Sequence, residues 1–134
     1  MDAPLRHASA AWFEMVGMQM VDAARNADGD VSLLERFTDG ADLGDGRVQG
    51  LRFEIVGGVA SFRTGVQPGE TADIVIHVTT AASRRLNTLY DGDPAYRVAV
   101  DEAVRNGALR IEGDVGKLGA WFADVHDAVV ERTR

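Results

Sequence analysis

The chain has 134 residues, of which 46% are apolar and 26% charged, as is typical of one soluble globular domain with its own core. A net charge of −7 argues against nucleic acid and anionic membrane surfaces as partners, because both attract basic proteins. The absence of cysteine excludes disulfides, thiolate metal ligands and a cysteine nucleophile.

Two further features concern the location of the protein. No apolar run approaches the roughly 20 residues of a membrane-spanning helix. The first residues, MDAPLRHASAAWFEMV, lack the basic and apolar segments of a secretory signal. We therefore expect a cytoplasmic protein with no membrane insertion. Arginine dominates the basic residues, and Lys117 is the sole lysine, which favours a bacterial source with a GC-rich genome.

The N-terminal third predicts helices. A long helix is expected over residues 5–25, with Trp12, Val16 and Met20 in an apolar stripe wider than one helix face needs. A short second helix is expected over 31–38, so that residues 1–46 form a helical N-terminal part. The wide stripe leaves open a subunit interface, and with it a homodimer formed through the first helix.

Strands are predicted from residue 48 onward. Residues 48–56 and 59–66 alternate in polarity around a Gly57-Gly58 turn, residues 72–79 form a third strand, and residues 109–112 form a last one. A period of two assigns the side chains to two faces. The apolar face carries Leu51, Phe53, Ile55, Phe62, Ile74, Ile76, Val78, Leu109 and Ile111. The polar face, expected to meet water, carries Arg52, Glu54, Ser61, Arg63, Asp73, His77, Arg110 and Glu112.

Helical signals return between and after these strands. Thr79 or Thr80 is a candidate cap for a helix beginning near residue 80, and Pro94 suits the first turn of the next helix.

In the stretch GALRIEGDVGKLGAWF, residues 107–122, a strand ends at glycines and is followed by an amphipathic helix. A phosphate loop has this shape too, but Leu118 follows Lys117 where that loop needs serine or threonine. We interpret the glycines as a structural bend.

Residues 53–55 (FEI), 72–76 (ADIVI) and 107–118 (GALRIEGDVGKL) resemble the sterol carrier protein 2 (SCP2-like) family over about residues 48–125. The resemblance implies one α+β domain over residues 1–134, with the sheet and its covering helices over 48–125. It implies a mixed sheet of four to five strands, helices packed on one face, and an apolar tunnel between them.

The function implied by this resemblance is that of a binding or carrier protein for an apolar small molecule or lipid. The guest would be a fatty acyl chain, a sterol-like ring system or a polyketide-like compound. Candidate lining residues are Phe53, Phe62, Ile76, Leu89, Val104, Leu118, Trp121, Phe122 and Val125. The residues alone favour a packed core without any void, because close packing is the norm, and only the resemblance favours a cavity.

Catalytic signals are weak. His7, His77 and His126 are scattered, and no pair has metal-ligand spacing, so we expect no metal and no cofactor. His77 with Asp73 or Glu54 is the one candidate for acid–base chemistry, although a histidine on a polar sheet face is more often structural. Two alternatives to a carrier therefore remain: a small enzyme of secondary metabolism, a cyclase or isomerase using the same cavity, and a dimerisation module without a ligand.

Overall fold

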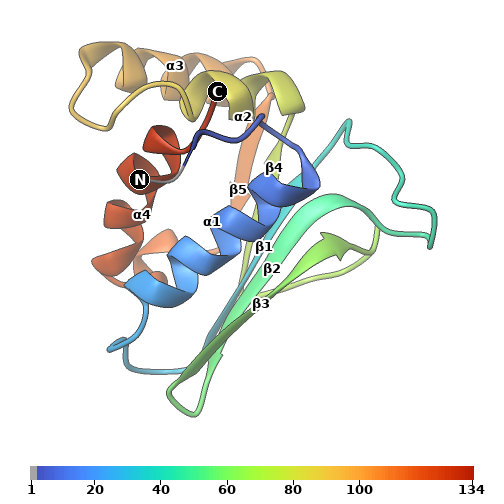
Figure 1. The fold of residues 1–134 in the computed structure, drawn as a ribbon, viewed down its shortest axis with the longest axis vertical. Coiled ribbons are helices and arrows are strands. Elements are labelled where there is room, and N and C mark those ends of the chain that lie inside the picture. The colour runs from blue at the N-terminus through green and yellow to red at the C-terminus, as the bar shows by residue number, and fades with distance from the viewer. Residues whose placement is uncertain (1–2) are drawn as a thin grey trace.

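Five strands form a mixed sheet in the order β3-β2-β1-β4-β5 in the computed structural model, which describes residues 3–134. β1 is parallel to β4, and the other neighbouring pairs are antiparallel. The helices lie on one side of this sheet (Figure 1), which confirms the predicted α+β class. The strand bounds are Val31–Phe37 (β1), Val48–Val56 (β2), Val59–Val66 (β3), Ile74–Val78 (β4) and Leu109–Glu112 (β5).

The prediction of a helix over residues 31–38 is wrong, since this segment is the central strand β1. Val31, Leu33 and Phe37 face the helices, whereas Leu34 is buried on the opposite side of the sheet. Burial on both faces masks the alternation that marks a half-exposed strand, and a short apolar run of this kind does not distinguish strand from helix. The predicted helical part over 1–46 therefore contains one helix and one strand.

Within residues 3–134, four α-helices cover one face of the sheet. α1 (Ala10–Ala23) lies over β2 and β3 and beside α4 (Trp121–Glu131), whereas α2 (Thr80–Leu86) and α3 (Pro94–Arg105) pack together at one end of the sheet (Figure 1). The side chain of Thr79 caps α2, and that of Asp93 caps α3 directly before Pro94. The local capping signals therefore placed both helix starts correctly.

The first helix begins five residues later than predicted. Ser9 caps α1 by accepting a hydrogen bond from the Trp12 amide at 3.1 Å. The preceding Leu5 instead pairs with the C-terminal segment, its amide donating to the Arg132 carbonyl at 2.7 Å. The two ends of the described chain are thus tied together beside α1 and α4.

The predicted apolar face of the sheet is confirmed as the side under the helices. Leu51, Phe53 and Ile55 of β2 are at most 3% exposed, and Ile74 and Val78 of β4 belong to the same core. The predicted polar face carries a network of charges in which Glu70 pairs with both Arg52 and Arg63. This face is drier than predicted, because Leu34, Val66 and Val75 form a second, smaller buried cluster on it.

The glycine-rich stretch after β5 is a tight bend. Gly113 has a φ of +89°, and a Cβ atom there would lie 2.3 Å from the Asp73 carbonyl oxygen. Asp114 then caps a short 3₁₀ turn, η1 (Val115–Leu118), its carboxylate accepting from the Gly116 amide at 2.9 Å. The Gly116 amide already donates to the Asp114 carboxylate, so it is not free to bind an external anion. The bend instead redirects the chain from β5 toward α4.

Candidate functional site

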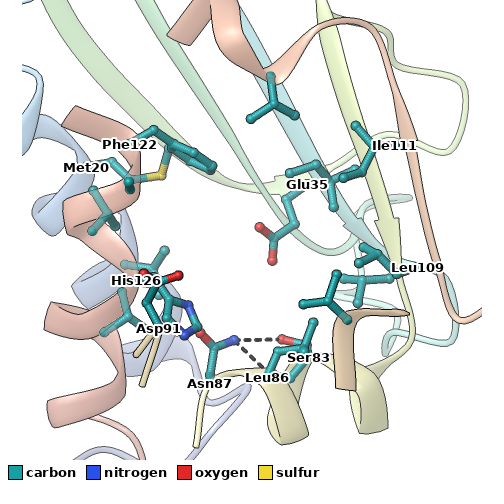
Figure 2. Close-up of a pocket in the computed structure, with 18 of the residues that line it drawn as sticks. Met20, Glu35, Ser83, Leu86, Asn87, Asp91, Leu109, Ile111, Phe122 and His126 are labelled. Atoms are coloured by element: carbon teal, nitrogen blue, oxygen red, sulfur yellow. Dashed lines mark hydrogen bonds between the residues drawn. The ribbon is translucent and has the colours of Figure 1, made fainter. Parts of the chain in front are cut away.

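A cavity of about 330 Å³ lies between the helix-facing side of the sheet and the four α-helices. Figure 2 shows most of its lining side chains around an open centre. α1 supplies Trp12, Val16 and Met20, which recur every four residues and so share one helix face. The rest of the lining is Glu35, Ile76, Val78, Ser83, Leu86, Asn87, Asp91, Tyr96, Val100, Leu109, Ile111, Val115, Phe122, Ala123, Val125, His126 and Val129.

The walls of the cavity are mainly hydrocarbon and aromatic. β4 and β5 contribute apolar side chains from their helix-facing side, and α4 contributes Phe122, Val125 and Val129 at helical spacing. Trp12 is held in place by a hydrogen bond of 2.9 Å from its Nε1 to the hydroxyl of Thr133. The volume and the apolar lining fall within the range of pockets that bind small molecules.

One end of the cavity is polar and internally satisfied. Asn87 donates from Nδ2 to the carbonyl of Ser83 at 2.8 Å and to its hydroxyl at 3.2 Å (Figure 2). The hydroxyl of Ser83 also contacts Nε2 of His7 at 2.9 Å. Burial and the nearby charge of Arg84 lower the pKa of His7 to about 4, so that His7 is neutral at pH 7.

His126 and Tyr96 form the second part of this polar end. Nε2 of His126 lies 2.7 Å from the carbonyl oxygen of Leu89, which places a proton on that nitrogen, because a carbonyl only accepts. The ring of Tyr96 lies 4.4 Å from that of His126. Burial, followed by the neighbouring charge of Asp91, raises the pKa of Tyr96, so its phenol stays protonated near neutral pH.

Glu35 is the residue that sequence reasoning missed. It lies on the helix-facing side of β1, between Leu33 and Phe37, and its carboxyl group points into the cavity (Figure 2). Within residues 3–134 this carboxyl has no hydrogen-bond or ion-pair partner. Burial raises its pKa from 4.5 to about 7. Reading VSLLERF as a strand would have placed Glu35 on the core face.

Three of the predicted lining residues, Ile76, Phe122 and Val125, line the cavity. Phe53 and Trp121 pack on each other with ring centroids 5.3 Å apart and lie outside the lining. The remaining predicted residues lie elsewhere: Leu118 is buried in the core, Phe62 packs against Gly17 of α1, Val104 is 55% exposed, and Leu89 contributes its carbonyl to His126.

The three candidates for acid–base chemistry lie on the opposite face of the sheet from the cavity. Nδ1 of His77 accepts a hydrogen bond from Arg36 at 2.9 Å, because a guanidinium only donates. Nε2 therefore carries the proton and donates to Glu112 at 2.6 Å. Asp73 accepts from the Ser32 amide at 3.0 Å, and Glu54 lies 3.6 Å from Arg52. His77 and Asp73 contact neighbouring strands, Glu54 contacts Arg52 of its own strand, and the sheet separates all three from the cavity.

Other classes of site find little support. Among residues 3–134 no group of three histidine, aspartate or glutamate side chains is arranged to hold a metal ion. No helix in this range is long and apolar enough to span a membrane.

The apolar stripe of α1 points mainly inward, with Trp12, Phe13, Met15 and Met20 buried, whereas Met18 is 54% exposed. A homodimer through α1 stays a prediction.

No family model matches the chain, and no curated protein matches it. Among solved structures, the chain is similar to a double mutant of the sec-alkylsulfatase Pisa1, an enzyme from Pseudomonas sp., with a TM-score of 0.51 and 22% identity. This match covers 83% of the chain and 15% of the sulfatase. The chain thus spans a small part of that enzyme and is similar in fold to that part alone.

Structures of sterol carrier protein 2 are also among those to which the chain is similar. One crystal structure of that protein matches 92% of the chain and 94% of its own length, with 18% identity and a TM-score of 0.45. The apo form of sterol carrier protein 2 from Yarrowia lipolytica matches 92% of the chain and 82% of its own length, with 12% identity and a TM-score of 0.41.

Proposed function

We propose that the protein is a non-catalytic binding or carrier protein for an apolar small molecule held in the cavity between the sheet and its helices. The observation that carries the proposal is the 330 Å³ cavity itself, with walls of valine, leucine, isoleucine and aromatic side chains. Apolar walls that the chain's own side chains leave uncovered gain free energy when an apolar guest covers them. Each methylene group buried there contributes about 0.8 kcal/mol to binding.

The direct test has two measurements. Native mass spectrometry of the freshly purified protein should detect a co-purified apolar compound as an added mass. Titration with 1-decanol should change tryptophan emission, because Trp12 lines the cavity. The absence of both an added mass and a response to 1-decanol would contradict the proposal.

A cavity-filling pair of variants locates the binding site. Val100 of α3 lines the cavity, whereas Val98 of the same helix is 53% exposed and outside the lining. Val100→Phe places a phenyl ring in the space for the ligand and is expected to weaken 1-decanol binding about tenfold or more, since a filled pocket excludes its ligand. Val98→Phe makes the same change on the surface and should bind as the unaltered protein does. Equal affinity of the two variants would place the ligand elsewhere.

A second candidate function, a small cyclase or isomerase, is supported by one observation. Glu35 presents to the cavity a carboxyl whose pKa is raised to about 7, which suits proton transfer near neutral pH. Incubation of the protein with a lipid extract, followed by chromatography and mass spectrometry, would test this function. A product formed by the unaltered protein and not by Glu35→Gln would favour the enzyme over the carrier.

A further inference from the structure

The lining of the cavity is rich in acidic groups. Two carboxylates, Glu35 and Asp91, belong to its lining, and among the described residues no lysine or arginine does. The nitrogen that His126 could offer from Nε2 is already directed at the Leu89 carbonyl. A cavity built in this way offers acceptors to a guest and neither lysine nor arginine, within residues 3–134, to an anionic headgroup.

The carboxyl of Glu35 has no hydrogen-bond or ion-pair partner among residues 3–134. In contrast, Glu70, Glu102 and Glu112 pair with arginine or histidine. Its carboxyl group projects into the open centre of the cavity, toward the end where Ser83 and Asn87 lie (Figure 2). Glu35 is partly buried, and its carboxyl oxygens are not closed off from the cavity by other atoms. A ligand that enters the cavity can therefore reach this carboxyl and form the hydrogen bond that the protein does not supply.

We propose that the guest of this cavity is an apolar molecule that carries one basic nitrogen, and that Glu35 receives its ammonium group. The inference rests on the proposed function and narrows it to a class of ligand. The hydrocarbon part lies against the apolar walls, and the ammonium donates to the carboxylate. The lining also contains the aromatic residues Trp12, Tyr96 and Phe122, and aromatic rings attract cations.

The same charges disfavour a fatty acid anion. A ligand carboxylate in this cavity would lie near Glu35 and Asp91 with no cation to offset the repulsion. A neutral alcohol of equal length has neither the attraction nor the repulsion. Three ligands with one hydrocarbon chain and different headgroups therefore separate the contribution of charge from that of hydrocarbon burial.

Binding of an amine should depend on pH. The groups that face Glu35 are Asp91 from the segment before α3, Tyr96 from α3 and His126 from α4, with His7 behind Ser83. Burial raises the pKa of Glu35 to about 7, so that its carboxyl is neutral at pH 5 and ionised at pH 8. An alkylamine stays protonated at both values, because its pKa is near 10, as for lysine. Amine affinity should therefore rise from pH 5 to pH 8.

The experiment compares decylamine, 1-decanol and decanoate by tryptophan emission at pH 5 and pH 8. At pH 8 the unaltered protein is expected to bind decylamine about tenfold more tightly than 1-decanol, and decanoate more weakly than either. Glu35→Gln should remove the preference for the amine and its pH dependence while leaving 1-decanol affinity within about twofold. Glu14→Gln is the control, because Glu14 is an exposed residue of α1 outside the lining.

The outcomes separate the two proposals. If none of the three compounds binds, the proposed function fails. If 1-decanol binds as well as decylamine, or decanoate binds best, the cavity holds apolar ligands but the inference about the basic nitrogen is overturned. A loss of affinity for all three compounds in Glu35→Gln would assign Glu35 a structural role and would also overturn the inference.

Discussion

Replacing Glu35 with glutamine is expected to stabilise the protein above pH 7, by at most about 3 kcal/mol because the residue is only partly buried. The pKa of Glu35 is raised from 4.5 to about 7, and each pKa unit corresponds to about 1.4 kcal/mol. The folded state therefore binds more protons than the unfolded state between these values. Stability falls as the pH rises through this window, and the cost is complete above pH 7. Glutamine stands in for the protonated form and does not ionise.

The measurement is urea unfolding of both proteins between pH 4 and pH 9. The difference in unfolding free energy, variant minus unaltered protein, should be near zero at pH 4 and reach its full value by pH 8. Glu14→Gln should show no such growth, because Glu14 is exposed. A difference that does not change with pH would mean that Glu35 is solvated in the folded state.

His7 contributes a slope of the opposite sign. Its pKa is lowered from 6.5 to about 4, so the unfolded state binds more protons between these values and stability is lost as the pH falls. In the unaltered protein the slopes of Glu35 and His7 oppose each other over most of this window. Glu35→Gln should therefore reveal a loss of stability on acidification from pH 6.5 to pH 4, which the unaltered protein largely masks.

Replacing Gly113 with alanine is expected to cost more than about 3 kcal/mol, the largest effect of a single methyl group that we foresee in this fold. The backbone there has a φ of +89°, where a side chain is strained, and the new Cβ atom would lie 2.3 Å from the Asp73 carbonyl oxygen. That oxygen belongs to the backbone directly before β4, which cannot move without disturbing the pairing of Val75 with Glu112.

Gly107→Ala is the matched control for this prediction. Gly107 also has a positive φ, +80°, but a Cβ atom there meets nothing within 4 Å. Its replacement should cost about 1 kcal/mol, from backbone strain alone. Thermal and urea unfolding of the two variants compare the costs. Equal losses would show that the close approach of Gly113 to the sheet contributes nothing.

Local patterns were enough to predict much of this fold. Alternation located β2, β3, β4 and β5 and assigned their apolar face, because side chains on a strand alternate whatever the strand pairs with. Thr79, Pro94 and the glycines after Glu112 marked helix starts and a bend, because each acts through its own backbone conformation. These features depend on residues a few positions apart.

The rest was decided by contacts between distant segments. β1 is a strand because it pairs with β2 on one side and with β4 on the other. Because both of its faces are buried, its sequence shows no alternation of apolar and polar residues. Its placement turns Glu35 toward the helices and into the cavity. The volume of the cavity is the difference between the space that the sheet and its helices enclose and the space that their side chains fill, and no local sequence pattern records that difference.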